Sequence, residues 1–392
     1  MTTAISTVSL DSAPVVVVGA GLFGLTVAER IANVMGLRVT IVESRPHVGG
    51  NAYSFFDSDT GIEVHRYGSH LFHTSNERVW NYVNQFTHFN SYIHHVFTRH
   101  GSDIFSMPIN LHTISQYVGT AMSPDEAREW VEQQRNVGDH ESDNNLESKA
   151  VSLIGRPLYE AFIKGYTEKQ WQTSPRSLPA ETISRLPVRF SFDSRYFSDT
   201  WEGLPLNGYG AWFEAMLANP LIKIHTGTDF FEIRNEIPKG AITIYTGPID
   251  KYFNYRLGRL GWRTLDFEFE RVQTNDFQGT SVMNYADVDI PFTRIHEFKH
   301  LHPEREYSFG VTNIAREYSR KASPSDEPYY PINTQYDRDL LTKYRALAKA
   351  ERNVFFGGRL GSYKYLDMHM AIASALTMFE NEIRPRLSAR VS

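Results

Sequence analysis

Strand and helix patterns alternate near the start of the chain. Residues 1–13 are small and polar without periodicity, which predicts a loose tail. The run 15–18 is apolar and β-branched throughout, as is typical of a strand buried on both faces of a parallel sheet. Apolar residues then recur at helical spacing over 25–32, and a second apolar run spans 39–42. The pattern predicts a βαβ unit beginning near Pro14.

The middle of the chain changes from strand to helix patterns. Two strand-like runs between Ser91 and Leu111 flank Gly101-Ser102-Asp103, which predicts a hairpin. Apolar positions follow helical spacing from 114 to about 171, with a polar interruption at 139–145. Because prolines divide 172–189, that segment is predicted to be a loop. We interpret the helical block as a separate insertion.

Short strand patterns dominate the rest of the chain. They are found at residues 222–225, 230–233, 241–246, 265–291, 295–311 and 354–356. The last strand leads into Gly357-Gly358-Arg359, and Asp367 then stands at the N-cap position of a long predicted helix. The patterns together indicate an α/β protein with a helical block and additional strands.

Composition and charge exclude several classes of function. The chain has 392 residues, a net charge of −5 and no cysteine. Without cysteine there are no disulfides, thiolate nucleophiles or cysteine-ligated zinc. The net charge offers no general attraction to nucleic acid or to an anionic membrane. No lysine or arginine precedes Arg30, and Glu29 and Arg30 interrupt the first apolar run, so we predict neither a signal peptide nor a membrane span and expect a cytoplasmic protein.

A glycine motif joins the first strand to the first helix. Gly19-x-Gly21-x-x-Gly24 has the spacing of the dinucleotide-binding fingerprint, in which glycines allow a tight turn, close approach of a pyrophosphate and close helix packing. Glu43 ends the second strand about 20 residues later and would accept hydrogen bonds from ribose hydroxyls. The helix N-terminus adds N–H groups and a partial positive charge. A glycine-rich βα turn without a ligand is the alternative interpretation.

The residues after Glu43 distinguish a flavin from a nicotinamide cofactor. Arg45 and Gly49-Gly50-Asn51 form an extension that resembles FAD-binding flavoproteins of the glutathione-reductase and amine-oxidase type. In those proteins a late strand, glycine turn and helix contact the flavin, and Gly357-Gly358-Arg359 with the Asp367 helix fits that role. His70 and His73 are interpreted as lining the flavin pocket.

Histidines are dense between residues 65 and 100, yet we predict no metal site. His94 and His95 are neighbours, so they would point to opposite faces of a strand. The chain has no cysteine to complete a ligand set. It also has no GxSxG elbow, which argues against a serine nucleophile.

Aromatic and cationic residues occur together in the later segments. Arginine forks and tyrosine hydroxyls suit a diphosphate, and flat aromatic rings suit a nucleobase. The residues are Phe162, Tyr166, Lys169, Trp171, Arg185, Arg189, Arg195, Tyr196, Arg294, His296, Lys299, Tyr329, Tyr330, Arg359, Tyr363 and Tyr365. They support the hypothesis of a nucleoside-diphosphate substrate. The alternative is that they form surface ion pairs and core contacts.

Several longer motifs resemble one family. They are Gly19-x-Gly21-x-x-Gly24, residues 68–74, Tyr166-Thr167-Glu168-Lys169-Gln170-Trp171, Leu186-Pro187-Val188-Arg189-Phe190, Thr246-Gly247-Pro248, Thr293-Arg294-Ile295-His296-Glu297, Gly358-Arg359-Leu360-Gly361 and Tyr365-Leu366-Asp367. Together they resemble the UDP-galactopyranose mutase family over nearly the whole chain after Pro14. Two positions depart from that family: Ser69 stands where many bacterial members carry proline, and Ile163 stands where a second aromatic residue is frequent.

The resemblance implies an isomerase that interconverts UDP-galactopyranose and UDP-galactofuranose with FAD in its reduced form. In the family's mechanism the reduced flavin N5 attacks the anomeric carbon, UDP leaves, and the sugar ring opens through a flavin iminium before it recloses. The resemblance also implies an external reductant such as NAD(P)H, a homodimer, and a supply of galactofuranose for cell-surface glycans and the cell wall. The alternatives are an FAD-dependent oxidoreductase of the amine-oxidase type and a nucleotide-binding module without catalysis.

The resemblance assigns roles to residues through the motifs. Arg185, on a mobile loop at 172–186, and Arg294 would bind the diphosphate as catalytic residues, and His73 would lie against the flavin. The implied substrate contacts are Phe162, Tyr166, Trp171, Arg185, Tyr196, Asn284, Arg294, Tyr329, Tyr365 and Asp367. The implied cofactor contacts are Gly19, Gly21, Leu22, Phe23, Gly24, Glu43, Ser44, Arg45, Gly50, Asn51, His70, Leu71, Thr246, Gly247, Gly358, Arg359, Tyr365, Leu366 and Asp367.

The resemblance also divides the chain into domains. It implies a discontinuous Rossmann-like FAD-binding domain, a helical insertion domain and an antiparallel β-sheet domain. The boundaries would be 14–90, 205–255 and 352–392 for the first, 112–185 for the second, and 91–111, 186–204 and 256–351 for the third.

Overall fold

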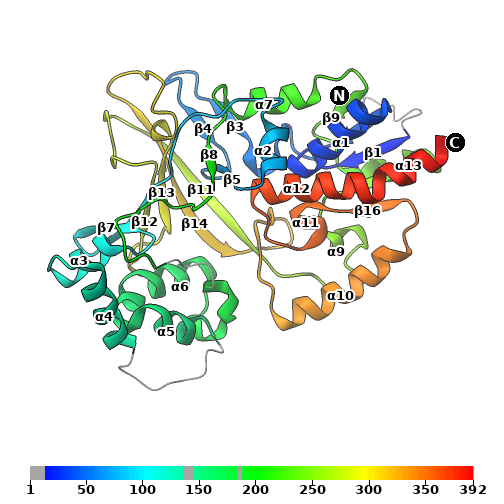
Figure 1. The fold of residues 1–392 in the computed structure, drawn as a ribbon. Helices are drawn as coiled ribbons and strands as arrows, with labels where there is room; N and C mark the ends of the chain where they lie inside the picture. The colour runs from blue at the N-terminus through cyan, green and yellow to red at the C-terminus, as the bar shows by residue number, and fades with distance from the viewer. Residues whose placement is uncertain (1–13, 136–144, 184–187, 392) are drawn as a thin grey trace, which may run out of the picture.

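A computed structural model of the protein describes residues 14–135, 145–183 and 188–391. Figure 1 shows a parallel sheet with its helices on the right, a long antiparallel sheet in the centre and a group of helices at the lower left. This arrangement confirms the predicted α/β class with a helical block and a second sheet. The tail predicted at 1–13 lies outside the described residues, and the domain boundaries stay a prediction.

The parallel sheet has five strands that come from distant parts of the chain. Its order is β16-β10-β1-β2-β9 and every neighbouring pair is parallel. The strands are β1 (Val15–Val18), β2 (Val39–Val42), β9 (Ile222–His225), β10 (Ile242–Tyr245) and β16 (Val354–Phe356). All residues of β1, β2 and β10 are buried, as their unbroken apolar runs predict.

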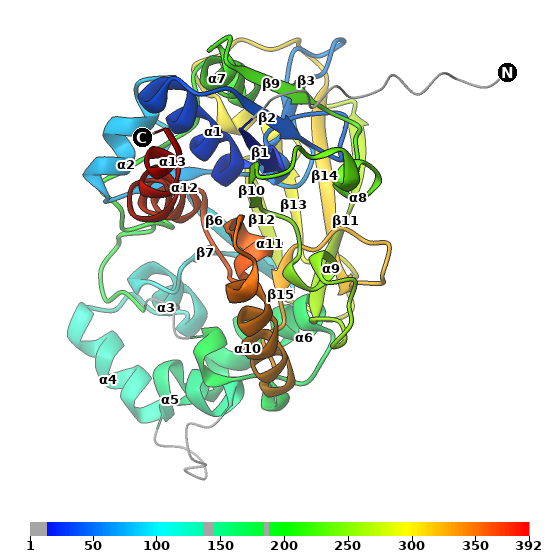
Figure 2. The same ribbon diagram turned by 90° about the vertical axis from the view of Figure 1, so that its right-hand side faces the viewer.

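Helices cover both faces of the parallel sheet. Val15 and Val17 enter a hydrophobic cluster with α1 (Leu22–Met35), α7 (Gly208–Leu217) and α12 (Met368–Met378). The alternate residues of β1 enter a second cluster, which includes α8 (Phe230–Ile233), α9 (Ile249–Tyr252) and α10 (Gln335–Ala350). Figure 2 shows α1 and α12 on one side of β1, with α8 and α9 on the other. The sheet is therefore enclosed by helices on both sides.

The strand predicted at 230–233 is wrong. These residues form the helical turn α8, whose N-cap Asp229 accepts a hydrogen bond from Phe231 N with its side chain. Phe230 and Ile233 are both buried in the same cluster. Their spacing of three residues suits one helix face, whereas a strand would turn them to opposite faces.

The second sheet has seven strands and is mainly antiparallel. Its order is β15-β11-β14-β13-β12-β6-β7, and only the β12–β6 pair is parallel among the described residues. The strands are β6 (Val96–His100), β7 (Asp103–Met107), β11 (Trp262–Val272), β12 (Val282–Tyr285), β13 (Arg294–Glu297), β14 (Thr312–Lys321) and β15 (Tyr330–Pro331). The hairpin predicted around Gly101-Ser102-Asp103 is confirmed. The run predicted at 265–291 is too long, because a loop separates β11 from β12, and the run at 295–311 is too long, because β13 ends at Glu297 and β14 begins only at Thr312.

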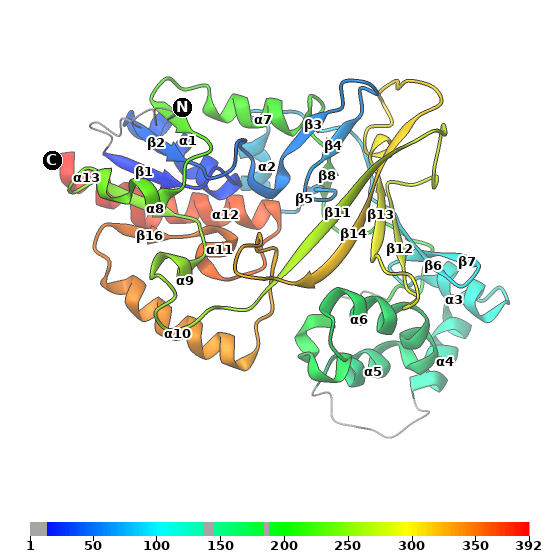
Figure 3. The same cartoon turned by 180° about the vertical axis from the view of Figure 1, so that it is seen from behind.

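The helical block has its own hydrophobic core. It contains α3 (Leu111–Val118), α4 (Pro124–Arg135), α5 (Leu146–Leu158), a π turn at Tyr159–Lys164 and α6 (Gly165–Trp171). Short 3₁₀ turns at Pro175–Ser177 and Ala180–Ile183 follow, in place of any longer helix or strand within the described part of 172–189. Figure 3 shows α6 next to the lower end of β14. The helical pattern predicted from 114 to 171 is confirmed.

The remaining elements are short or terminal. They are β3 (Ser54–Phe56), β4 (Glu63–His65), β5 (Phe72–Thr74), β8 (Trp201–Gly203), α2 (Glu77–Val83), α11 (Gly358–Ser362) and α13 (Arg384–Val391). Single turns occur at Gly50–Ala52, Arg234–Glu236, Phe298–Leu301 and Phe379–Ile383. Within the described ranges, no helix combines the length and apolar content that a membrane span requires.

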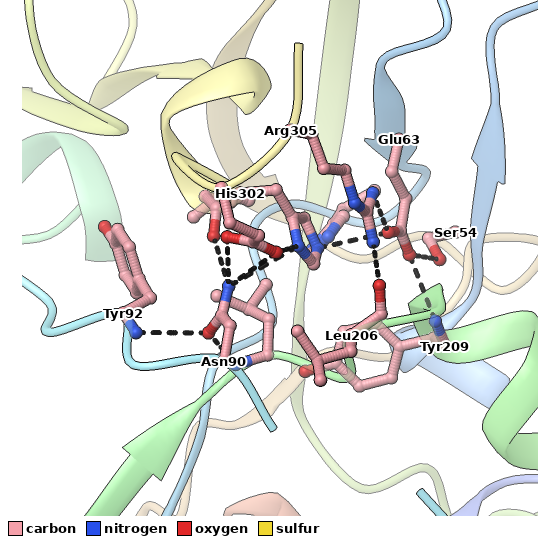
Figure 4. Close-up of polar contacts among 12 residues, drawn as sticks. Ser54, Glu63, Asn90, Tyr92, Leu206, Tyr209, His302 and Arg305 are labelled. Atoms are coloured by element: carbon pink, nitrogen blue, oxygen red, sulfur yellow. Dashed lines mark hydrogen bonds and ion pairs between the residues drawn. The ribbon is translucent and has the colours of Figure 1, made fainter. Parts of the chain in front are cut away.

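A buried carboxylate joins three of these segments. Glu63 on β4 accepts hydrogen bonds from Ser54 Oγ at 2.6 Å and Tyr209 N at 3.0 Å, and it pairs with Arg305 at 2.9 Å. His302 lies between Glu63 (3.2 Å) and Glu304 (2.7 Å). Figure 4 shows this network. Burial alone would raise the pKa of Glu63, but the hydrogen bond with His302 and its other partners hold it well below the usual range.

Replacing Glu63 by Gln removes the charge that His302 and Arg305 share. We expect the free energy of unfolding at pH 7 to fall by about 2–4 kcal/mol. Because the folded-state pKa of Glu63 is depressed, its contribution is present above the unfolded pKa, about 4.3, and is lost as the pH falls through the folded pKa. Urea unfolding at neutral and acidic pH measures this effect.

The difference in the free energy of unfolding between Glu63→Gln and the wild type should become smaller at acidic pH. Glu268→Gln, at an exposed position on β11, is the control and should change stability by less than about 0.5 kcal/mol. A Glu63→Gln penalty that did not change with pH would show that the charge of Glu63 does not carry the stabilisation.

Candidate functional site

A cavity of about 960 Å³ opens at the carboxyl ends of the central parallel strands. Val18, Val42 and Tyr245, which end β1, β2 and β10, line it. The predicted cofactor residues that line it are Gly19, Gly21, Leu22, Phe23, Gly24, Glu43, Ser44, Arg45, Gly50, Asn51, His70, Thr246, Gly247, Gly358, Arg359 and Leu366. Leu71, Tyr365 and Asp367 were predicted with them but are not part of the lining. The carboxyl edge of a parallel sheet is where α/β folds bind ligands.

The glycines of the motif are required by close contacts. Gly19 has a φ of +102°, and a Cβ there would lie 2.1 Å from Thr246 Oγ1. A Cβ on Gly24 would lie 2.0 Å from the carbonyl oxygen of Gly19. At Gly21 the nearest atom to an added Cβ is the Cα of Gly50, 4.0 Å away. Gly19 and Gly24 therefore serve the fold, while Gly21 keeps backbone exposed to the cavity.

Glu43 is fixed at the end of β2 by backbone donors. Its Oε2 accepts a hydrogen bond from Ala20 N at 2.7 Å, and its Oε1 accepts one from Arg45 N at 2.8 Å. Each carboxylate oxygen has a second lone pair, so Glu43 can also accept ribose hydroxyls. Gly21 gives α1 no side-chain cap, which leaves N–H groups of the first helical turn available to an anion.

Arg45 is held over the cavity by Asn51, which was predicted as a cofactor contact, and by Glu327 and Tyr67, which sequence reasoning missed. Its guanidinium pairs with Glu327 at 2.7 Å, donates to Asn51 Oδ1 at 3.0 Å and lies 4.4 Å from the centre of the Tyr67 ring. Glu327 belongs to the segment 321–328, which lines the cavity throughout. This segment has no nucleotide-binding motif, so its place could be found only from the fold.

The C-terminal segment closes the other side of the cavity. Gly358 has a φ of +73° and leads into α11 beside Phe23. Arg359 donates to the carbonyl oxygen of Leu366 at 2.7 Å, which fixes the start of α12. Asp367 is the N-cap residue of α12, as predicted, but its side chain makes no capping bond. The cavity's volume, its uncapped helix and its glycine-lined wall fit a dinucleotide such as FAD.

A second polar cluster lies on one face of the antiparallel sheet. Arg294 on β13 is the cross-strand partner of both Asn284 on β12 and Glu317 on β14, so the three side chains share a face. Arg294 Nε lies 3.2 Å from Glu317, and Arg294 Nη2 donates to Tyr166 Oη at 2.5 Å. Tyr196 and Tyr330 also lie near this arginine.

The ionisation of this cluster follows from its burial. Burial alone would raise the pKa of Glu317, but Arg294 and His296 outweigh it and lower that pKa. Burial would lower the pKa of Arg294, but Glu317 holds it well above the usual range. Burial also raises the pKa of Tyr166. The cluster is therefore a paired cation and anion with a neutral phenol.

Helix α6 is docked onto the same sheet and carries Tyr166. Lys169 donates to the carbonyl oxygens of Tyr285 and Phe292, at 2.7 and 3.0 Å. A Cβ on Gly165 would lie 2.3 Å from the carbonyl oxygen of Ala286, so α6 approaches the end of β12 closely. Burial lowers the pKa of Lys169 to about 8. Part of the role of the Tyr166–Trp171 motif is therefore to fix the position of α6 on the sheet.

Several predicted residues occupy unexpected places. Phe162 is buried in the helical core against Phe105 and Tyr117, with ring centres 4.9 and 5.7 Å away, and it does not line the cavity. Tyr329 lies near Arg45 at the cofactor side, whereas Tyr330 lies near Arg294. Adjacent residues in extended chain point to opposite sides, which explains the difference. Trp171 ends α6 and packs against the helical core.

His73 lies in a pocket of histidines and carboxylates outside the cavity lining. Its Nδ1 bonds Asp199 at 2.7 Å, and its ring stacks on Phe197 with centres 3.7 Å apart. His73, Asp367 and His369 offer possible ligand atoms within 4.8 Å of one another. They meet at the first turn of α12, where the partial positive charge of a helix N-terminus disfavours a cation. The absence of a metal stays a prediction.

The predicted diphosphate ligand Arg185 lies outside the described residues, as do Leu186 and Pro187 of the family motif at 186–190. Of the two arginines predicted to bind the diphosphate, the structure therefore describes only Arg294. His296 and Glu317, which form the buried surroundings of Arg294, were missed as a pair. The i, i+2 spacing of Arg294 and His296 could have placed them on one face, but the partner strand could not be found from spacing.

Two family models match the chain. The model described as UDP-galactopyranose mutase matches residues 161–365, and the model described as an NAD(P)-binding Rossmann-like domain matches residues 17–86. A probable UDP-galactopyranose mutase of Klebsiella pneumoniae is 43% identical, over 94% of this chain and 94% of its own. A dTDP-fucopyranose mutase of Escherichia coli is 38% identical, over 92% of this chain and 96% of its own.

Solved structures agree with these matches at the level of the fold. A reduced UDP-galactopyranose mutase has a TM-score of 0.68 at 14% identity, covering 94% of this chain and 95% of its own. A putative protoporphyrinogen oxidase from Exiguobacterium has a TM-score of 0.62 at 12% identity, covering 94% and 98%. At these identities the likeness shows the fold alone. A fold shared with an oxidase does not choose between reactions.

A methyl group on Gly21 tests the cofactor site. The φ of Gly21 is −74° and a Cβ there meets nothing closer than 4.0 Å, so Gly21→Ala should fold normally. The methyl would stand between the backbone and a pyrophosphate, and we expect FAD affinity to fall about tenfold or more. The flavin content of the purified protein and an FAD titration of the apoprotein measure this.

Gly210→Ala on α7 is the matched control, because a Cβ there meets nothing within 4 Å and Gly210 does not line the cavity. It should keep its flavin. If Gly21→Ala bound FAD as tightly as the wild type, the pyrophosphate would not lie where the glycine motif predicts.

Proposed function

The chain belongs to the UDP-galactopyranose mutase family, and from this we propose that it is an isomerase that interconverts UDP-galactopyranose and UDP-galactofuranose with FAD. The observation that carries the proposal is that family likeness extends from the glycine motif through the sheet that bears Arg294. Bound and reduced, FAD supplies a nucleophile for the anomeric carbon of the sugar. The protein supplies binding, orientation and charge.

In this proposal Arg294 binds the diphosphate. It is a partly buried guanidinium that keeps its charge because Glu317 is its neighbour, and Tyr166 adds a hydroxyl beside it. When the bond to the anomeric carbon breaks, negative charge grows on the departing UDP. A preorganised arginine stabilises that charge without reorganisation of solvent. The same contact holds UDP in place until the sugar ring has reclosed.

Asn284 supplies orientation for the sugar, and His73 lies against the flavin. Among the described residues, Asn284 Oδ1 is buried without a hydrogen-bond partner, and it lies on the same sheet face as Arg294. An unpaired buried acceptor is costly unless a ligand donates to it, and sugar hydroxyls are such donors. Asp199 fixes one nitrogen of His73, which leaves the other nitrogen for a ligand.

The choice of sugar nucleotide has a second candidate. The dTDP-fucopyranose mutase is only a little less similar than the Klebsiella relative. A fucosyl group lacks the hydroxyl at carbon 6 and thymine adds a methyl to uracil, so the two substrates differ at both ends. A site built to bond the missing hydroxyl would reject the fucosyl substrate strongly. We place UDP-galactose first because the matching family model carries that name.

Further features of the proposal come from the family resemblance. The enzyme takes reducing equivalents from an external donor such as NAD(P)H, works as a homodimer in the cytoplasm, and contributes galactofuranose to cell-surface glycans. Arg185 closes over the substrate with the loop at 172–186, and joins Arg294 on the diphosphate. An FAD-dependent oxidoreductase of the amine-oxidase type is disfavoured, because the oxidases share only the fold.

Activity should require reduced flavin. Purified holoenzyme is incubated with UDP-galactofuranose, with and without dithionite, and the nucleotide sugars are separated by chromatography. We expect UDP-galactopyranose to form only, or far faster, in the reduced sample. Equal inactivity in both samples would contradict the mutase. A parallel incubation with dTDP-fucofuranose decides between the two substrates, since preferential turnover of that compound would make the second candidate correct.

Removing Arg294 should impair catalysis while FAD stays bound. Arg294→Ala takes away the charge that faces the diphosphate, and we expect kcat/KM to fall by a factor that corresponds to about 2–4 kcal/mol. Arg316→Ala is the matched control, because Arg316 is on β14 beside Glu317 but points to the opposite face and pairs with Glu270. Normal turnover by Arg294→Ala would show that the diphosphate binds elsewhere.

A further inference from the structure

A continuous chain of hydrogen bonds and one ion pair leads from the segment beside the cofactor cavity to Arg294. Ser69 Oγ lies 2.8 Å from His296 Nδ1, and His296 Nε2 lies 3.1 Å from Glu317 Oε2. The other oxygen of Glu317 lies 3.2 Å from Arg294 Nε. The side chains of His296 and Glu317 are only 2% and 3% exposed. A buried imidazole therefore shares one carboxylate with the arginine proposed for the diphosphate.

The partners of His296 fix the position of its proton. Glu317 is ionised and can only accept, so His296 Nε2 carries the hydrogen and donates it to Glu317. In the neutral ring, Nδ1 is then an acceptor. It receives the Ser69 hydroxyl at 2.8 Å, with the Ser69 backbone N–H at 3.4 Å. A second proton on His296 would have to go to Nδ1, facing Ser69.

The hydroxyl of Ser69 can bond His296 Nδ1 in both protonation states, whereas the Ser69 backbone N–H can donate only to the neutral ring. A hydroxyl rotates, so it can donate to neutral Nδ1 or accept from a protonated Nδ1–H. Alanine could do neither, and proline, which many family members carry here, would also lack the backbone N–H. The Ser69 hydroxyl thus faces the nitrogen that would take the second proton.

The surroundings keep His296 neutral in the free protein. Burial lowers the pKa of His296, and the nearby cation Arg294 opposes a second positive charge, while Glu317 acts in the other direction. His65, His70 and His94 also face this region, and burial lowers their pKa values to about 3, 4 and 3. Among these four described imidazoles, His296 alone has a hydrogen bond to a carboxylate.

A bound diphosphate would change this charge balance. Before binding, Arg294 and Glu317 neutralise each other. A nucleoside diphosphate brings two negative charges to Arg294, which leaves Glu317 without a full counter-charge inside the protein. Water compensates the charge of Glu317 little, because the side chains of Glu317 and His296 are buried. The nearest group that can supply a positive charge to Glu317 is His296.

We propose that His296 is a positioning residue that takes up a proton from solvent at Nδ1 when the diphosphate of a nucleotide sugar binds Arg294, and that Ser69 accepts the new hydrogen bond. The proposal rests on the proposed function for the identity of the ligand. The protonated ring pairs with Glu317 and frees Arg294 to serve the diphosphate. His296 touches neither sugar nor phosphate, and acts through Glu317.

Proton uptake can be measured by calorimetry. Oxidised holoenzyme is titrated with UDP-galactopyranose near pH 6.5 in buffers of different ionisation enthalpy, since the slope of binding enthalpy against that enthalpy counts protons. UDP-galactopyranose is the probe because its diphosphate has no group that titrates near neutral pH, unlike UDP. We expect roughly half a proton or more per nucleotide sugar, falling towards zero as the pH rises. The affinity for UDP-galactopyranose should accordingly rise as the pH falls through the range in which His296 takes up the proton.

Three variants separate a titrating role from a structural one. His296→Gln should bind the nucleotide sugar with no proton uptake. Ser69→Ala should keep its fold and flavin but show reduced uptake, because protonated Nδ1 loses its acceptor. His112→Gln, which replaces an exposed histidine on α3, should behave like the wild type. The flavin content of each variant verifies that it is folded.

The outcomes distinguish this inference from the proposed function. If UDP-galactopyranose did not bind the wild type at all, the proposed function would be wrong. Binding whose enthalpy is independent of the buffer would overturn the inference alone. Uptake that persisted in His296→Gln would likewise overturn it, because another group would then take the proton. Uptake that is lost in His296→Gln and reduced in Ser69→Ala would support it.

Discussion

The buried carboxylate of Glu317 imposes the main constraint on the active face of the antiparallel sheet. An anion enclosed in protein must be neutralised and hydrogen-bonded, and the surrounding segments meet that requirement. Arg294 and His296 reach it from β13, and Thr293 donates its hydroxyl. Gly68 passes so close that a Cβ there would lie 3.6 Å from the carboxylate. The guanidinium offered to a substrate is thus held by the same group that keeps it charged.

Buried carboxylates connect distant segments elsewhere too. Glu43 joins the end of β2 to the turn after β1, and Glu63 joins β4 to α7 and to the segment after β13. Asp57 accepts hydrogen bonds from Arg271 and Asn313 of the antiparallel sheet, and these partners lower its pKa to about 2 against the effect of burial. Buried ion pairs and hydrogen bonds, as well as apolar packing, therefore hold the two sheets and the walls of the cofactor cavity in position.

Sequence alone predicted local elements of structure well, but it predicted poorly which distant residues contact one another. The βαβ unit and glycine motif were found because a buried strand, its turn and its helix are adjacent in the chain. Asp229 and the spacing of Phe230 and Ile233 signalled a helical turn that an apolar run obscured. Phe162 was assigned to the substrate by motif, but its neighbours Phe105 and Tyr117 are set by tertiary packing. The partnership of His296 with Glu317 depends on strand register, which no local pattern gives.

The alternation of side chains along β13 limits how this enzyme can evolve. Arg294 and His296 occupy the face of β13 that meets Glu317, while Ile295 between them is buried on the other side. Substitution of Arg294 or His296 changes the charge balance that both share with Glu317. We therefore expect selection against substitutions at these two positions. Adaptation to a new sugar or base is therefore left to the parts that cover the sheet: the helical block and the 68–70 segment. Relatives that act on different substrates can therefore share the sheet and differ in the segments that cover it.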